Sequence, residues 1–551
     1  MKAIAHEKRS AALFHPLLFL LLSFIAYYSI LNSYFLSDDF AQIGKVLEGD
    51  WSLAWGREYG GFFRPLFILS YIIDSRVWGE RPFGYHLTNT LLHALNSCLV
   101  YSLTRRLLRP QKLTEDAMRV ISLVAGLLFL VHPSHTEAVS WISGRADLLA
   151  TVFCLTSLLA FISYVEKRRA LYLLLAGLSF ALALLSKESA VSLPFILFAF
   201  ALYFAKVERR ATAASLLRAL KQSALFVPLL LLFILARRWA LGAWVGGYGA
   251  GQHLNFSPGW IRDRFLQASL RALLPAFPLQ LSNILLKPLQ SSLFILFALA
   301  SAALIILLLR RRRRLEDGVI RSEQNGLLLL LVASFVLSLL PVINLRLSLF
   351  DTQGERFVYW PSAFTSILIS YLCFILLRRR GWRIALALCL LIFYSVSLCR
   401  TNQTWREAAE ISRAVKEELS RAASNEQSLI VVNAPDNLRG VPLFHNGLEE
   451  ALRVFQPRAQ TERVNVLSLH SIQSAGDAVE LKREGEVFSL RLANQLDEFT
   501  RIADGADCVQ VQARSRDHFQ FRLDDCTQRI ALLFFDAGKV YRVLSSEEPP
   551  R

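Results

Sequence analysis

The sequence predicts an α-helical polytopic membrane protein with a small soluble domain near its C-terminal end. Hydrophobic residues make up 54% of the 551 residues, and many apolar runs are close to twenty residues long, the length that crosses a bilayer as a helix. Positive residues form short clusters between these runs, which is typical of cytoplasmic loops. The net charge of +17 therefore indicates membrane topology and not a nucleic-acid partner.

The apolar runs predict about eleven membrane spans. The basic N-terminal residues precede the first run without a clear cleavage site, so we expect an uncleaved first span and not a signal peptide. The predicted spans are residues 11–36, 84–104, 118–132, 146–165, 170–186, 189–205, 222–241, 286–309, 326–344, 359–377 and 383–400.

Five basic clusters follow even-numbered spans in this scheme, which places them together with the N-terminus on the cytoplasmic side. They are residues 105–109, 167–169, 206–210, 310–314 and 378–380. The exception is Arg237 and Arg238 at the outer end of the seventh run, which suggest an anionic ligand or interfacial snorkelling. Residues 260–277 contain arginines among apolar residues, and counting them as a span would move the cluster 310–314 outside. We therefore expect an interfacial or re-entrant amphipathic helix there.

The polar tail contains β-rich stretches at 429–432, 488–492 and 530–535, which predict an α/β or mainly β domain. The expected organisation is a membrane domain (1–400) with a long first outer loop (37–83), a linking helix (401–425) and a periplasmic domain (426–551).

Two cysteines, Cys508 and Cys526, lie in the polar tail. If that tail is extracytoplasmic they could form a disulfide bond.

Asp38 and Asp39 form an acidic pair where the first apolar run ends. They could lie among the lipid headgroups and merely end a helix. They could equally perform chemistry, because a neighbouring carboxylate and burial both raise a carboxyl pKa and can produce a general base.

A histidine-rich segment joins the third and fourth spans. His132, His135 and Glu137 suggest a metal site, but their spacing differs from the helical zinc motif and Pro133 interrupts a regular helix. The alternative is a hydrogen-bonded plug between helix ends.

Arg145 and Asp147 follow that segment, and because isolated charges entering a span need partners we expect them to pair or cap.

Three cations on the predicted outer face are candidates for binding an anion. Arg356 lies at the entrance of the tenth span, where a guanidinium can bind phosphate through two hydrogen bonds. Arg64 could bind phosphate, a lipid or Asp74. Lys187 and Glu188 lie in a tight turn and are expected to face a polar cavity.

These motifs resemble the membrane half of the TMTC-type protein O-mannosyltransferases and their bacterial relatives, which belong to the GT-C superfamily. The resemblance covers about residues 30–410. After Trp405 the sequence lacks the tetratricopeptide repeats of the eukaryotic members. The motifs are Ser37-Asp38-Asp39, Phe63-Arg64-Pro65-Leu66, Gly84-Tyr85-His86-Leu87-Thr88-Asn89, His132-Pro133-Ser134-His135-Thr136-Glu137-Ala138-Val139, Gly144-Arg145-Ala146-Asp147-Leu148-Leu149, Lys187-Glu188, and Glu355-Arg356-Phe357 with Pro361-Ser362.

The resemblance implies a GT-C-like glycosyltransferase that moves a mannose-like sugar from a polyprenyl-phosphate donor to a protein or glycan acceptor at the outer face, with inversion. Asp38 or Asp39 would be the base, and Arg356, Arg64 and Lys187 would bind the donor phosphate. No cofactor is required, although Mg²⁺ or Mn²⁺ stays open, with Asp39 as the candidate ligand. The residues expected to line the site are His86, His132, His135, Glu137, Arg145, Asp147, Glu188 and Glu355.

Two other functions would fit the same composition. A transporter or flippase of lipid-linked glycans also needs charges near a bilayer cavity, and a noncatalytic scaffold could present the tail to a partner. The low lysine content and compact tail suggest a bacterial inner-membrane protein with a cytoplasmic N-terminus and a periplasmic C-terminal domain.

Overall fold

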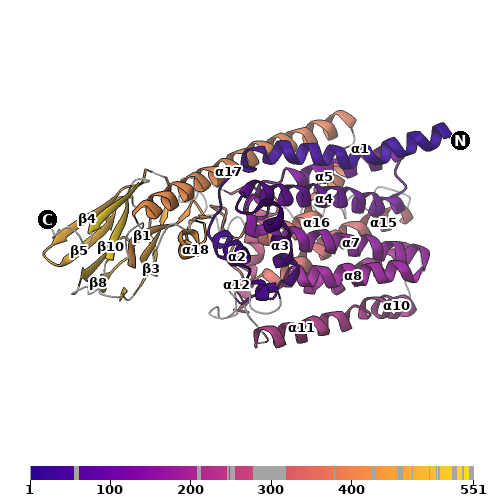
Figure 1. Cartoon of the computed structure of the whole chain (residues 1–551). Coiled ribbons are helices and arrows are strands. Elements are labelled where there is room, and N and C mark those ends of the chain that lie inside the picture. Colours follow the sequence, from indigo (N-terminus) through magenta and orange to yellow (C-terminus); the bar gives the residue numbers. More distant parts are fainter. Residues whose placement is uncertain are drawn as a thin grey trace.

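The computed structural model has a bundle of long helices at one end and two β-sheets at the other (Figure 1). It describes residues 2–54, 61–207, 213–242, 244, 247, 255–276, 318–377 and 379–422, and residues 428–544 with short gaps. The prediction of a helical membrane protein with a C-terminal domain that contains β-structure is confirmed.

The long helices of the bundle lie side by side, with α1 beginning at the end of the molecule far from the sheets (Figure 1). The helices are α1 (Lys2–Tyr27), α2 (Asp38–Leu47), α3 (Pro65–Trp78), α4 (Pro82–Leu108), α5 (Glu115–Leu130), α6 (Thr136–Val139), α7 (Arg145–Lys167), α8 (Ala170–Ser186), α9 (Leu193–Val207), α10 (Ala213–Ala224), α11 (Val227–Leu241), α12 (Pro258–Arg271), α15 (Gly318–Leu339), α16 (Tyr359–Leu376) and α17 (Arg380–Ala422).

Within the described residues, six helices are long and apolar enough to cross a membrane, or seven if the bent pair formed by α5 and the segment Pro133–Val139 is one span. The predicted span 286–309 and the cluster 310–314 lie outside the described residues. Leucines such as Leu174 on α8 and Leu232 on α11 are exposed, as lipid-facing side chains would be.

The two basic clusters that follow α4 and α7 lie at the same end of the bundle. Arg106 at the end of α4 forms an ion pair of 2.5 Å with Glu166 at the end of α7. This agrees with the charge pattern, which predicts that the second and fourth spans end on the same side.

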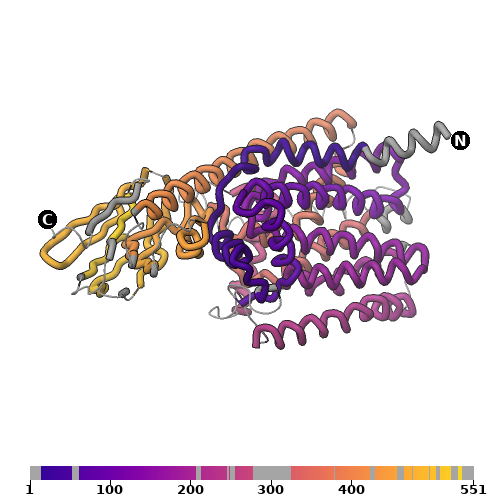
Figure 2. The backbone as a smooth tube through the Cα atoms, viewed as in Figure 1, coloured from indigo at the N-terminus to yellow at the C-terminus, as the bar shows by residue number. Residues whose placement is uncertain are grey.

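The helix α17 connects the bundle to the C-terminal domain without a break (Figure 2). The last predicted span and the predicted linking helix are thus parts of one helix, because the segment between them contains no glycine or proline that would end it. The division of the chain into domains at residue 400 stays a prediction.

The C-terminal domain contains two sheets with the strand orders β11-β10-β1-β3-β6 and β4-β5-β9-β8-β7, and β1 runs parallel to both β3 and β10. The three predicted strand segments lie in β1, β5 and β10. Cys508 and Cys526 lie outside the described residues. The strands are β1 (Ser428–Leu438), β2 (Val441–Pro442), β3 (Arg463–Ile472), β4 (Val479–Glu484), β5 (Val487–Leu492), β6 (Phe499–Ile502), β7 (Gly505–Ala506), β8 (Val509–Arg514), β9 (His518–Leu523), β10 (Ile530–Asp536) and β11 (Lys539–Leu544), with helix α18 (Leu448–Arg453) between β2 and β3.

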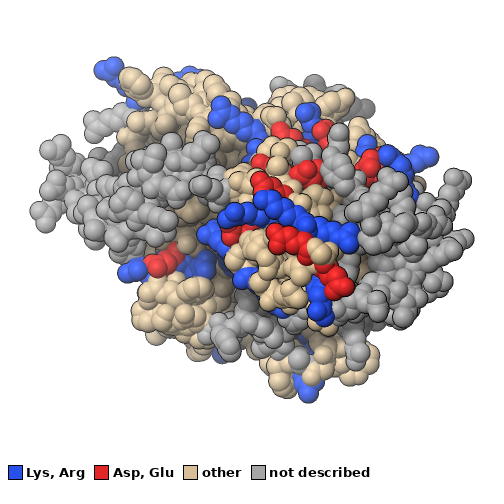
Figure 3. All heavy atoms as spheres, turned by 90° about the vertical axis from the view of Figure 1, so that its left-hand side faces the viewer, with Lys and Arg blue, Asp and Glu red and all other residues tan. Residues whose placement is uncertain are grey.

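The C-terminal domain packs on the first outer loop through aromatic side chains. The ring of Phe40 on α2 stacks on Phe444 with centroids 5.9 Å apart, and it also contacts Phe455 at 5.4 Å. Phe35 contacts Phe455 at 5.1 Å. Large buried aromatic contacts of this kind fix the two parts relative to each other. Seen from the domain end, the surface carries positive and negative side chains next to one another (Figure 3).

Candidate functional site

A cavity of about 560 Å³ lies between the bundle and the C-terminal domain. This volume is within the usual range for small-molecule sites. Its wall combines residues of the first outer loop, the α6–α7 region, the segment before α16 and the β1–α18 region. Nine charged or titratable side chains line it: Asp38, Arg64, Glu137, Asp147, Lys187, Arg346, Arg356, Asp436 and His445.

The structure separates the two members of the acidic pair. Asp38 lines the cavity, is half-buried, and accepts a hydrogen bond of 2.7 Å from the Asn446 amide. Asp39 is 1% exposed and does not line the cavity. Successive residues at the start of a helix project about 100° apart, so the two carboxylates cannot face the same space.

Asp39 holds two loops together. Its carboxylate accepts hydrogen bonds from the Leu36 N–H at 3.1 Å and from the N–H and hydroxyl of Ser143 at 2.9 and 2.5 Å. Burial raises the pKa of Asp39 to about 7, while the hydrogen bonds with Ser143 and Leu36 act in the opposite direction. This arrangement gives Asp39 a positioning role beside the cavity.

Each cation that the sequence predicted for phosphate binding lies at the cavity, and each one is already paired. Arg356 forms an ion pair with Glu137, whose second oxygen accepts the Arg356 backbone N–H at 2.8 Å. Lys187 contacts Asp147 at 2.5 Å.

Arg64 forms two hydrogen bonds with Glu188, of 2.7 and 3.0 Å. The expected partner Asp74 is engaged elsewhere, and the neighbours Lys187 and Glu188 each bind a partner distant in sequence instead of each other.

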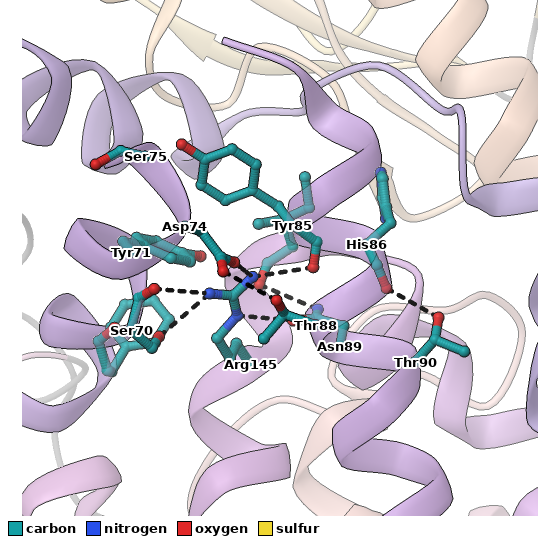
Figure 4. A network of polar contacts seen from close by, with 12 residues as sticks. Ser70, Tyr71, Asp74, Ser75, Tyr85, His86, Thr88, Asn89, Thr90 and Arg145 are labelled. Atoms are coloured by element: carbon teal, nitrogen blue, oxygen red, sulfur yellow. Dashed lines mark hydrogen bonds and ion pairs between the residues drawn. The ribbon is translucent and has the colours of Figure 1, made fainter. Parts of the chain in front are cut away.

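Arg145 pairs with Asp74 at 2.7 Å and Asp147 with Lys187, so both charges have partners as expected, but they do not pair with each other. Residues two apart on a helix do not face each other, which excludes direct contact. Figure 4 shows the Arg145 guanidinium at the centre of a polar network, where it also donates to Asn89 Oδ1 at 2.8 Å and to the Tyr85 carbonyl at 2.9 Å. Its side chain is 0% exposed, so Arg145 ties α3, α4 and α7 together behind the site.

The histidines that could have held a metal are buried and hydrogen-bonded within the protein. His132 Nε2 lies 3.1 Å from the Ala272 carbonyl, His135 Nε2 lies 2.7 Å from the Ser362 hydroxyl, and His86 Nε2 lies 3.2 Å from the Ser33 carbonyl. None of them lines the cavity. The geometry is that of the hydrogen-bonded plug.

Glu355 is also withdrawn from the cavity. It forms an ion pair with Arg271 at the end of α12 and accepts a hydrogen bond of 3.1 Å from the Thr136 hydroxyl. The segment 260–277, expected at the membrane interface, thus contributes the buried Arg271 to the support of the site.

The described residues contain no group of three or more His, Cys, Asp or Glu side chains that could hold an ion. Asp39, the candidate ligand, uses both carboxylate oxygens as acceptors for N–H and O–H groups.

Among the lining residues that the sequence did not identify are Arg346, Asp436, His445 and Asn446. Arg346 is an exposed cation in the loop before α16, and the pattern of a lone arginine between two spans could have identified it. The other three come from the C-terminal domain, and no local pattern in the sequence connects them with residues about four hundred positions earlier.

Two of the charged lining residues differ from the others because they form no ion pair. Glu137, Asp147 and Asp436 each have a cationic partner. Among the described residues, Asp38 forms no ion pair with a cation, and Arg346 forms none with an anion. The cavity therefore presents one carboxylate and one guanidinium that are not held in ion pairs, although the charge of Arg346 also acts on the buried Asp351.

Residues 66–239 match the family model described as dolichyl-phosphate-mannose-protein mannosyltransferase. The protein O-mannosyl-transferase Tmtc1 of Drosophila melanogaster is 34% identical over 188 residues, which cover 31% of this chain and 21% of that protein. The human protein O-mannosyl-transferase TMTC2 is 42% identical over 106 residues, which cover 19% of this chain and 12% of that protein. The matches thus span well under half of the relatives' own lengths.

Two solved structures are similar at low sequence identity. ArnT from Cupriavidus metallidurans in the apo state gives a TM-score of 0.47 at 12% identity, covering 82% of this chain and 90% of that one. The archaeal oligosaccharyltransferase AglB from Archaeoglobus fulgidus gives 0.41 at 11% identity, covering 92% and 80%.

The matched segment 66–239 contains Asp147 and Lys187, which line the cavity, and Arg145 and Glu188, which form ion pairs around it. Over this segment the chain is similar to the family described as dolichyl-phosphate-mannose-protein mannosyltransferase and to the protein O-mannosyl-transferases.

Proposed function

We propose that this protein transfers a mannose-like sugar from a polyprenyl-phosphate donor to a hydroxyl group of a protein or glycan acceptor, with inversion. The observation that carries the proposal is that one cavity is lined by a carboxylate, Asp38, and a guanidinium, Arg346, that form no ion pair among the described residues. The family match of residues 66–239 and the names of the relatives support the class of donor and sugar.

Asp38 is the proposed base. It takes the proton of the acceptor hydroxyl, whose oxygen attacks the anomeric carbon from the face opposite the leaving phosphate. The bond between the anomeric carbon and the phosphate oxygen breaks, and the electron pair leaves with the lipid phosphate. Since that phosphate is a stable anion, no general acid is needed. Asp39 supports the reaction by fixing Leu36 and Ser143 beside Asp38.

The donor phosphate is proposed to bind on the wall formed by the helical part. Arg356, Arg64 and Lys187 line this wall, and Arg356 stays the first candidate for direct contact. Because all three are already paired with carboxylates, Arg346 adds the positive charge that a phosphate needs. Preorganised cations of this kind stabilise the charge that develops on a leaving group.

The cavity is proposed to lie at the outer face of a bacterial inner membrane. The N-terminal residues and the clusters that follow α4 and α7 are basic, which predicts a cytoplasmic location for that end of the bundle. The cavity is lined by residues of α2 and of the C-terminal domain. These elements lie at the opposite end of the bundle from the N-terminus, where the C-terminal domain would be periplasmic (Figure 1).

The test uses the full chain in proteoliposomes with a radiolabelled polyprenyl-phosphate-mannose. Formation of a new mannoside, or release of free mannose to water, supports the proposal. Movement of intact donor across the bilayer without a new glycosidic bond would instead identify a transporter, and neither activity would identify a scaffold. Both of these outcomes overturn the proposal.

A further inference from the structure

The C-terminal domain forms one wall of the cavity. The strand β1 contributes Asp436 and the loop before α18 contributes His445 and Asn446, whereas the cations Arg346 and Arg356 come from the helical part. The two walls therefore differ in chemistry: the helical part contributes the guanidinium groups and Asp38, and the C-terminal domain contributes a His–Asp pair and a neutral amide.

We infer that the wall from the C-terminal domain is the acceptor subsite, in which Asn446 orients the Asp38 carboxylate and the Asp436–His445 pair binds an uncharged, hydroxyl-bearing acceptor. This inference rests on the proposed function. It assigns the C-terminal domain a part in the reaction itself and predicts that anionic acceptors are poor substrates.

The wall is held firmly against the first outer loop. The Ser37 N–H donates to the Leu443 carbonyl at 2.8 Å, and the Asn446 N–H donates to the Ser37 hydroxyl at 3.3 Å. Gly447 has a φ of +83°, and a Cβ atom there would lie 2.5 Å from the Ser37 carbonyl oxygen. Such close backbone contacts make the wall a preorganised part of the cavity.

Asn446 forms a hydrogen bond with one oxygen of the Asp38 carboxylate. Its amide donates to Asp38 Oδ1 at 2.7 Å, and no described residue donates to Oδ2. A carboxylate has about four acceptor positions, so the acceptor hydroxyl can bind at the free oxygen. A neutral donor fixes the carboxylate without the strong loss of basicity that a paired cation would cause.

The imidazole of His445 is held by its Nδ1 atom, which lies 2.7 Å from Asp436 Oδ1. The His445 side chain is 62% exposed at the cavity, while that of Asp436 is 7% exposed. Among the described residues Nε2 of His445 has no hydrogen-bond partner. An anchored imidazole with a free nitrogen can bind a hydroxyl or carbonyl group of the acceptor as donor or acceptor.

The net charge of this wall decides the class of acceptor. A protonated His445 is balanced by Asp436, and the charged group in direct contact with this wall is the Asp38 carboxylate, 2.7 Å from the Asn446 amide. An acceptor with a carboxylate or phosphate beside its hydroxyl would be repelled by Asp38, whereas a neutral hydroxyl would not.

The experiment measures steady-state transfer by the full chain in proteoliposomes, with methyl α-mannoside and a neutral threonine peptide as acceptor probes. His445→Gln is expected to raise the KM for the probe at least tenfold while the KM for the donor changes less than twofold. Asn446→Ala is expected to lower kcat about tenfold with little change in either KM, because it disorients the base. His518→Gln, in the same domain but away from the cavity, is the matched control and should behave as the wild type.

A His445→Gln variant with an unchanged KM for the probe, or with a raised KM for the donor instead, would overturn the inference. So would an anionic peptide that is used as well as the neutral one. A single monodisperse peak in size-exclusion chromatography must show that the variants fold. If the wild type neither transfers nor releases mannose, the proposed function itself has failed, which is distinct from failure at the acceptor subsite alone.

Discussion

Replacing each aspartate of the acidic pair should give opposite effects on activity and stability. Asp38→Asn keeps an oxygen that can accept from Asn446, so the folded structure should lose at most about 1 kcal/mol. Removing a general base lowers the rate by about 10²- to 10⁴-fold, equivalent to roughly 3–5 kcal/mol in the activation barrier. Asp39→Ala instead leaves the Leu36 N–H and both Ser143 donors without an acceptor, which at about 1 kcal/mol each costs about 3 kcal/mol of stability.

Two measurements on the same detergent-purified variants distinguish these effects. One is the rate of mannose transfer from the lipid-linked donor at saturating concentration, and the other is the apparent Tm followed by tryptophan fluorescence. Asp38→Asn should be nearly inactive with an unchanged Tm, and Asp39→Ala should have a clearly lower Tm. Near-normal transfer by Asp38→Asn, or a stable but inactive Asp39→Ala, would refute the division of roles.

Three further predictions follow from contacts of the described residues. Arg145→Met leaves a buried carboxylate without its partner and should destabilise the protein by about 3–5 kcal/mol, measured as loss of folded protein in size-exclusion chromatography; normal folding would contradict the role of the network. Gly447→Ala forces a side chain into a left-handed conformation against a carbonyl oxygen and should cost about 1–2 kcal/mol, measured as a lower Tm, with Gly485→Ala, at positive φ with nothing nearby, as the control. The hydrogen bond from His445 to Asp436 raises the pKa of His445 and lowers that of Asp436, although burial alone would raise the latter. The raised pKa of His445 stabilises the folded state fully below pH 6.5, and this stabilisation is lost as the pH rises through the pKa of the folded state. The Tm difference between wild type and His445→Gln should therefore shrink from pH 6 to pH 9. A constant difference would refute the pairing.

Much of the fold could be predicted because membrane insertion leaves strong local signals. Apolar runs of spanning length and basic clusters depend only on neighbouring residues, and α4, α7 and α16 lie where these signals predict them. The β-rich stretches of the tail predicted three strands of the C-terminal domain, because strand formation also leaves a local pattern. They did not predict the strand order, because the parallel pairing of β1 with β3 and β10 depends on residues far apart in sequence.

The candidate site could be predicted only in part. The charged residues Asp38, Arg64, Lys187 and Arg356 were recognisable because charges beside apolar runs are costly and rarely incidental. Their partners were not, because an ion pair such as Arg64 with Glu188 joins positions 124 residues apart. Arg145 and Asp147 both find partners, as expected of charges that enter a span, but they do not contact each other because the helix turns the two side chains apart.

By itself the sequence determined that the chain crosses a membrane, that acidic and basic residues gather at the ends of its spans, and that its motifs resemble those of lipid-dependent mannosyltransferases. Only the tertiary structure decided which aspartate faces the cavity, which cations are already neutralised and which part of the tail reaches Asp38. The physical reason is the separation along the sequence over which each effect acts. Hydropathy and helix formation act over a few neighbouring residues, whereas burial, charge pairing and the Asn446–Asp38 contact exist only after distant segments have packed together.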